Sequence, residues 1–115
     1  MKCIIAGSRS IRHAVVLEAA ITASGWADDI TEVVSGGATG VDALGEEWAY
    51  KNHRRLMVFP ADWDTYGRSA GIRRNRQMAS YATHLIAVHD GVSKGTKHMI
   101  EEGKRRGLKV FVYEG

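Results

Sequence analysis

The chain has 115 residues, of which 44% are hydrophobic and 25% are charged. This length favours one domain over residues 1–115 with a single core, and the composition is typical of a soluble globular protein. The net charge of +3 suits an anionic ligand without demanding nucleic acid. No apolar run is long enough for a bilayer, the first strand leaves no room for a signal peptide, and the single cysteine, Cys3, cannot form an internal disulfide. We therefore expect a cytoplasmic protein without a membrane partner.

Apolar runs and helical patterns alternate along the chain. The strand-like runs cover residues 2–6, 31–34, 55–59, 83–88 and 109–113. The helical patterns cover residues 11–24, 41–49, 72–79 and 96–106, and residues 61–71 form a loop without a clear period. Five strands that alternate with four helices predict an α/β fold, an open parallel five-stranded sheet with helices on both faces.

Two helical patterns allow their buried faces to be predicted. In the first helix, a spacing of four places Ile11, Val15, Ala19 and Ala23 on one stripe. In the third helix, Ile72 and Met78 are expected to face the core.

The stretch Ser35-Gly36-Gly37-Ala38-Thr39-Gly40-Val41-Asp42 lies where the second strand turns into a helix. Glycine tolerates positive φ and allows a ligand to approach the backbone, and the first N–H groups of a helix favour an anion. Phosphate is the ligand that this kind of strand-to-helix turn most commonly binds. A tight strand-to-helix turn with no ligand explains the same glycines, and Asp42 could bind a ribose hydroxyl or only complement the helix dipole.

Two more polar loops follow strands at the same edge of the predicted sheet. Gly7-Ser8-Arg9 offers a close backbone approach, a hydroxyl and a guanidinium that can bind phosphate, although a turn with a surface arginine would look the same. Residues 90–96 place two glycines, Lys94 and two hydroxyls before a helix start, which is typical of an anion loop but lacks the P-loop spacing. Ligands of parallel sheets bind at this edge, so several such loops favour a site.

The densest basic cluster is formed by Arg68, Arg73, Arg74 and Arg76, with Asn75 among them. It is either a phosphate clamp or a solvated face, and we expect at least one arginine to point at the sheet edge. The five histidines show no metal-ligand spacing, so we predict no metal and no cofactor.

Taken together, these motifs resemble the YspA-type branch of the SLOG superfamily. The resemblance rests on Gly7-Ser8-Arg9, residues 35–42, Phe59-Pro60-Ala61-Asp62-Trp63, Arg74-Asn75 and Ser93-Lys94-Gly95-Thr96, and it covers nearly the whole chain. It implies a Rossmann-like sheet, a homodimer, and a nucleotide or nucleotide-derived ligand such as an ADP-ribose-like molecule. The candidate ligand-binding residues are Gly7, Ser8, Arg9, Ser35, Gly36, Gly37, Ala38, Gly40, Asp42, Asp62, Arg74, Asn75, Lys94, Gly95 and Thr96.

The same superfamily suggests two alternative functions. It includes LOG phosphoribohydrolases, which cleave the base from nucleoside monophosphates, and Arg74 matches the position of their catalytic arginine. Their motif glutamate is replaced here by Met99, whose thioether cannot act as a general base, so Glu101 or Glu102 would have to substitute. The superfamily also includes the DNA-processing protein DprA, which makes single-stranded DNA a second alternative partner.

Overall fold

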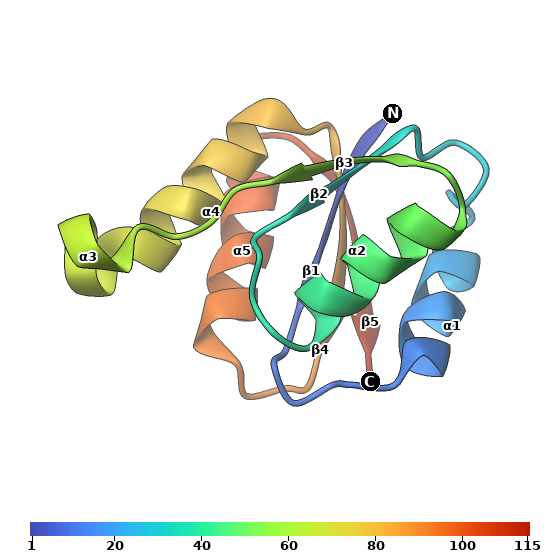
Figure 1. Ribbon diagram of the computed structural model, residues 1–115, viewed down its shortest axis with the longest axis horizontal. Coiled ribbons are helices and arrows are strands. Elements are labelled where there is room, and N and C mark those ends of the chain that lie inside the picture. Colours follow the sequence, from blue (N-terminus) through green and yellow to red (C-terminus); the bar gives the residue numbers. More distant parts are fainter.

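The computed structural model describes residues 1–115 and contains one five-stranded parallel sheet (Figure 1). The strands are β1 (Lys2–Gly7), β2 (Glu32–Ser35), β3 (Arg55–Val58), β4 (His84–His89) and β5 (Lys109–Glu114). Their order is β3-β2-β1-β4-β5, and all four neighbouring pairs are parallel. The predicted Rossmann-like open parallel sheet is confirmed.

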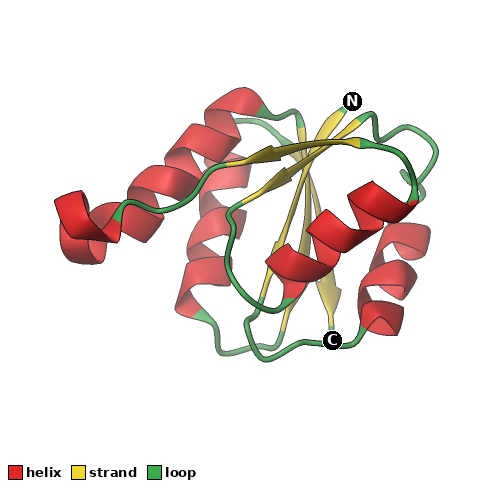
Figure 2. Cartoon of the chain, in the orientation of Figure 1, coloured by secondary structure: helices red, strands yellow, loops and turns green.

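Two helices cover each face of this sheet (Figure 2). They are α1 (Ala14–Ser24) and α2 (Val41–Lys51) on one side, and α4 (Ala70–Tyr81) and α5 (Lys94–Arg105) on the other. The short helix α3 (Trp63–Tyr66) precedes α4 and projects away from the sheet. No helix exceeds 12 residues, and none has the length and apolarity needed to cross a membrane.

The central strands β1 and β4 have apolar side chains on both faces. In β1, Cys3 and Ile5 pack toward α1 and α2, whereas Ile4 and Ala6 pack toward α4 and α5. Alternate side chains of a strand point to opposite faces, so a strand covered on both sides needs a continuous apolar run. The edge strand β3 is different, because all four of its residues are exposed.

The predicted buried stripe of the first helix is wrong except at Ile11, which is buried in the core although it precedes the helix. Helix α1 begins at Ala14 rather than at Ile11, and Val15 is 69% exposed. The residues of α1 that reach the core are Leu17, Ala20 and Ile21, which follow the i, i+3, i+4 spacing of a helical face. The larger Leu17 and Ile21 side chains bury more apolar surface than the predicted alanines would.

The third and fourth predicted helices, α4 and α5, begin earlier than expected, whereas α1 begins later. Helix α4 starts at Ala70, and Ile72, predicted to face the core, is 40% exposed, although Met78 is buried as expected. Helix α5 starts at Lys94 because the Ser93 Oγ accepts the Thr96 N–H at 3.3 Å as an N-cap. Lys94 and Gly95 therefore belong to the first turn of α5 and not to the preceding loop.

The predicted loop of residues 61–71 contains ordered turns. Asp62 caps α3, because its Oδ1 accepts the Thr65 N–H at 3.1 Å. A single 3-10 turn over Gly67–Ser69 then connects α3 to α4.

Gly40 is where the loop after β2 crosses the loop after β1. Its φ is 76°, and an added Cβ would lie 2.5 Å from both the Arg9 Cα and the Ser8 carbonyl oxygen. The next residue, Val41, donates its N–H to that same carbonyl at 3.3 Å. The two loops therefore touch through their backbones, which only glycine at position 40 allows.

Gly40→Ala should destabilise the protein more than Gly25→Ala does. Gly25 has the same φ of 76° but a ψ of 8°, compared with −130° at Gly40, and no atom lies within 4 Å of an added Cβ at Gly25. The Gly25 substitution therefore costs only the left-handed backbone, about 1 kcal/mol. The collision with residues 8 and 9 should add about 2 kcal/mol at Gly40. Urea unfolding of both variants checks this, and equal losses would contradict the packing described.

Candidate functional site

A cavity of about 320 Å³ opens at the carboxyl ends of the central strands β1 and β4. The strand order reverses between these two strands, which is the position where open α/β sheets bind ligands. The cavity volume lies in the range of small-molecule sites. Its walls come from the loop after β1, the loop after β4 with the first turn of α5, helix α4, and the start of α2.

Seven of the candidate residues lie together in this wall, and six further residues complete it. The candidates are Gly7, Arg9, Asp42, Arg74, Asn75, Gly95 and Thr96. Sequence reasoning did not single out Ala6, Ser10, Met78 and Met99 as ligand-binding residues, and it included Asp90 and Ser93 only as part of the predicted anion loop of residues 90–96. The signal for Asp90 and Ser93 was their place before a helix start, where aspartate and serine are typical capping residues. At least one of the clustered arginines points at the sheet edge, as expected.

The other candidates lie behind the wall or outside it. These are Ser8, Ser35, Gly36, Gly37, Ala38, Gly40, Asp62 and Lys94, none of which lines the cavity. The Ser35 hydroxyl donates to the Glu46 carboxylate at 2.7 Å and accepts the Gly37 N–H at 3.2 Å. The Ala38 N–H donates to the Asp42 Oδ2 at 3.3 Å. The N–H groups of residues 37 and 38 therefore already have acceptors within the loop.

Asp42 and Arg74 form the electrostatic centre of the cavity. Asp42 is only 5% exposed, and burial raises the pKa of its carboxyl, although the Ala38 N–H and the Arg74 charge act against the rise. Burial likewise lowers the pKa of the Arg74 guanidinium, and Asp42 opposes this. The Arg74 Nη1 donates to the Gly36 carbonyl oxygen. An added Cβ at residue 36 would lie 2.4 Å from that nitrogen, so glycine there makes room for the guanidinium.

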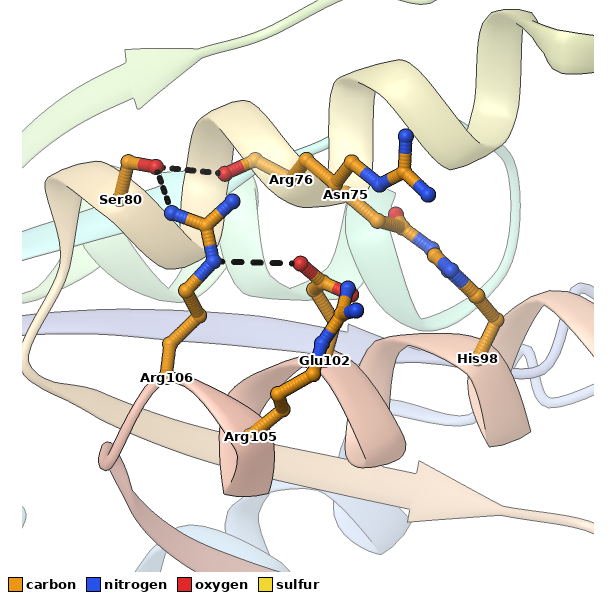
Figure 3. A network of polar contacts seen from close by, with 7 residues as sticks. All are labelled: Asn75, Arg76, Ser80, His98, Glu102, Arg105 and Arg106. Atoms are coloured by element: carbon orange, nitrogen blue, oxygen red, sulfur yellow. Dashed lines mark hydrogen bonds and ion pairs between the residues drawn. The ribbon is translucent and has the colours of Figure 1, made fainter.

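Asn75 connects Arg74 to the opposite wall of the cavity. Its buried Oδ1 accepts the Arg74 Nε–H at 3.1 Å. Its Nδ2 lies 3.4 Å from the Gly95 carbonyl oxygen and 3.0 Å from the His98 Nδ1, both in α5. Figure 3 shows Asn75 and His98 facing each other from α4 and α5. One amide therefore fixes the guanidinium and the first turns of α5 relative to each other.

Asp90 shapes the loop between β4 and α5. Its Oδ1 accepts the N–H groups of Val92 and Ser93 at 2.9 and 3.0 Å, and its Oδ2 accepts the Ser10 hydroxyl at 3.0 Å. These hydrogen bonds, that of Val92 first, lower the pKa of the Asp90 carboxyl to about 2. Asp90 therefore stays ionised and holds the loop closed on the residues after β1.

Arg9 is a cation in the wall with no ion-pair partner. Both ion pairs of the structure involve Glu102, which binds Arg105 and Arg106. Arg106 also donates to the Ser80 hydroxyl of α4 at 2.6 Å (Figure 3). Glu102 thus ties α5 to α4 and is buried away from the cavity. Neither Glu101 nor Glu102 lines the cavity, where Met99 is buried instead.

Comparison with known proteins agrees with this architecture. A family model described as the YspA, cpYpsA-related SLOG family matches residues 1–66. The chain belongs to this family. It is 34% identical over 85 residues to the gene 61 protein of Mycobacterium phage D29, a match that covers 69% of this chain and 68% of the phage protein.

A solved structure shows the same fold. The DNA processing protein A (DprA) from Streptococcus pneumoniae superposes with a TM-score of 0.74 at 19% identity. The superposition covers 97% of this chain but 49% of that DprA chain, so this YspA-related chain spans about half of its length. At this identity the similarity concerns the fold alone.

Asp42→Asn should change how stability depends on pH. The folded chain holds the Asp42 proton to higher pH than the unfolded chain, whose aspartate pKa is about 3.9. The free energy of unfolding of the wild type should therefore fall, relative to the variant, as pH rises through and above that value. Urea unfolding of both proteins at pH 3.5, 5 and 7 measures the difference. A constant difference, or one that favours the wild type as pH rises, would contradict the burial of an ionisable Asp42.

Proposed function

We propose that the protein binds a nucleotide or a nucleotide-derived molecule of the ADP-ribose type in the cavity at β1 and β4. One observation carries this proposal: two arginines, Arg9 and Arg74, lie in one wall with the Ser93-capped first turn of α5. Arginine and the first N–H groups of a helix are the groups that bind phosphate most readily in proteins. The position at the strand-order reversal adds support.

The remaining candidate residues have distinct roles in this proposal. Arg9 and Arg74 bind phosphate together with the N–H groups at the start of α5. The Asp42 carboxylate accepts a hydrogen bond from a sugar hydroxyl, which suits an acceptor at the cavity floor. Gly7 makes room for the Val88 carbonyl oxygen, which would lie 2.3 Å from an added Cβ. Lys94 adds a positive charge at the start of α5, and Ser8, Ser35 and Gly40 hold the loops in place.

Arg9→Ala and Arg74→Ala should each weaken nucleotide binding about 10- to 100-fold. A hydrogen bond to a charged group contributes about 1.5–3 kcal/mol, which corresponds to that range in Kd. Thermal unfolding against nucleoside monophosphates, NAD, ADP-ribose, cyclic nucleotides and a short DNA strand identifies the ligand class. At about a hundred times its Kd, a ligand should stabilise the wild type by about 2.7 kcal/mol.

Two arginines outside the cavity provide matched controls for this experiment. Arg12 lies in the same loop as Arg9, and Arg76 lies on the same helix as Arg74, yet neither lines the cavity. Arg12→Ala and Arg76→Ala remove the same charge and should leave the affinity within about twofold. Unchanged affinity in both cavity variants would refute the site.

Single-stranded DNA is a competing ligand for the same panel, because the structural relative is named a DNA processing protein. Binding to DNA should weaken steeply with salt and strengthen with strand length. A shift with the DNA strand alone, with that salt dependence, would replace the nucleotide proposal.

A nucleotide N-glycosidase is a second candidate function. The observation that favours it is a pair of carboxyl groups in one cavity whose pKa values move in opposite directions, upward for Asp42 and downward for Asp90. Asp42 would protonate the leaving base as the glycosidic C–N bond breaks, water would form the new C–O bond at the anomeric carbon, and the proton that this water loses would return to the Asp42 carboxylate. Arg74 would bind the phosphate.

This candidate predicts free base and ribose 5-phosphate from a nucleoside monophosphate, detected by chromatography after a long incubation. Asp42→Asn and Arg74→Ala should each lower the rate at least about 100-fold. Arg76→Ala should leave the rate unchanged. Intact nucleotides after incubation with the wild type would exclude the hydrolase and leave the binding proposal standing.

The expected homodimer and the expected cytoplasmic location stay predictions. The exposed edge strand β3, with Leu56, Met57 and Val58 each at least 38% exposed, is an apolar surface available for pairing.

A further inference from the structure

A second cavity, of about 260 Å³, lies next to the first on the same rim of the sheet. It is formed where the chain leaves β3, between Pro60, Asp62 and Tyr66 on one side and helix α4 on the other. Figure 1 shows this connection running along α4 into α3. The candidate residue Asp62, which the first cavity leaves out, lines the second.

Arg74 lines both cavities. On α4, Arg73 and Gln77 face the second cavity, Asn75 and Met78 face the first, and Arg74 stands between them. Its Nε and Nη1 donate to Asn75 and Gly36. Its Nη2 makes no hydrogen bond within the chain and points toward Gly71, since a Cβ added there would lie 4.0 Å from it. A guanidinium with a free edge therefore separates two spaces of similar volume.

The chemistry of the second cavity is suited to an organic ring rather than to a lone anion. The Arg73 guanidinium lies over the Tyr66 ring at 4.2 Å, and Tyr66 is 45% exposed. Stacked cations and aromatic rings present flat faces on which a heterocycle can stack. Asp62 uses Oδ1 to cap α3, which leaves Oδ2 as an acceptor, and the Gln77 amide offers a donor and an acceptor. These groups match the polar edge of a base or the hydroxyls of a ribose.

We propose that the two cavities are subsites of one site and that its ligand is of the dinucleotide type. Such a ligand has two nucleoside-like moieties joined through phosphates. The phosphates contact Arg74 at the boundary, one moiety occupies the cavity at β1 and β4, and the other occupies the cavity of Tyr66, Arg73 and Gln77. This inference rests on the proposed function and adds that a mononucleotide fills only half of the site.

The test compares one mononucleotide, AMP, with two dinucleotide-type probes, ADP-ribose and NAD, by titration calorimetry. The wild type should bind at least one of the two larger probes about tenfold or more tighter than AMP. Tyr66→Ala removes the stacking surface, and Gln77→Trp fills the cavity from an exposed position of α4. Each should remove that advantage, about a tenfold loss, while AMP affinity stays within about twofold.

Controls separate the subsites from folding and from general charge effects. Tyr66→Phe keeps the ring and should bind like the wild type, and Arg76→Ala, on the same helix but outside both cavities, should also be neutral. Arg9→Ala should weaken AMP and the larger probes alike, because Arg9 lines only the first cavity. Circular dichroism and the unfolding midpoint establish that each variant is folded.

The outcomes distinguish this inference from the proposal beneath it. Nucleotide binding that depends on Arg9 but is insensitive to both Tyr66→Ala and Gln77→Trp overturns the second subsite alone. Equal losses for AMP and the larger probes in these two variants also overturn it, because the cavities would then not divide the ligand. Failure of every nucleotide probe to bind the wild type overturns both proposals.

Discussion

Ser8 is the point on which the candidate site depends, because its backbone and side chain connect three loops. Its N–H donates to the Val88 carbonyl at the end of β4, and its own carbonyl accepts the N–H groups of Ile11 and Val41. Its buried hydroxyl accepts the Asp90 N–H at 3.0 Å. One residue thus fixes the loop after β1 to the loops after β2 and β4. The arginines and the α5 turn can face a common space only because these loops keep a fixed spacing.

The close approach of these loops explains several glycines better than ligand contact does. A Cβ on Gly7 would lie 2.3 Å from the Val88 carbonyl oxygen, and one on Gly40 would collide with residues 8 and 9. Gly36 gives room to the Arg74 guanidinium. The glycines shape the walls, whereas the groups able to bind an anion are side chains of the β1 loop, α4 and the start of α5. A glycine-rich pattern in the sequence is compatible with both roles, and only the packing of the loops distinguishes them.

Parts of the molecule that are set by local sequence patterns could be predicted, whereas parts that are set by contacts between residues far apart in the sequence could not. The central strands could be predicted because their burial on both faces leaves a continuous apolar run, as in Cys3 to Ala6. The stripe of α1 could not, because Val15 and Leu17 are both apolar and only the tertiary packing decides which is buried. The start of α5 is set by a local N-cap at Ser93, which the sequence contains. The predicted helix nevertheless began two residues too late, at residue 96 instead of 94.

The candidate site shows the same division. Arg9, Asp42 and Thr96 were predicted because polar residues after parallel strands meet at one edge, and Arg74 was predicted from the densest basic cluster of the sequence. Asp90 and Ser10 bind each other across 80 residues, and no local pattern signals such a pair. The second cavity was also beyond prediction, because it needs the ordered turns of α3 to lie against α4, and residues 61–71 have no helical period.

The charge of the chain divides between its two halves in a way that matches the proposed ligand. Residues 1–66, which the family model matches, contain 6 lysines and arginines against 9 aspartates and glutamates. Residues 67–115 contain 10 against 4, and they supply Arg74, Asn75 and the first turn of α5. The first part of the chain therefore builds the loop geometry and contributes Asp42, while the second part contributes Arg74 in α4 and Lys94 at the start of α5. An anion approaching the carboxyl edge of the sheet is attracted to α4 and α5 before it meets the buried carboxylate of Asp42. Such an arrangement favours a ligand that places phosphate against Arg74 and a hydroxyl-bearing sugar deeper in the cavity.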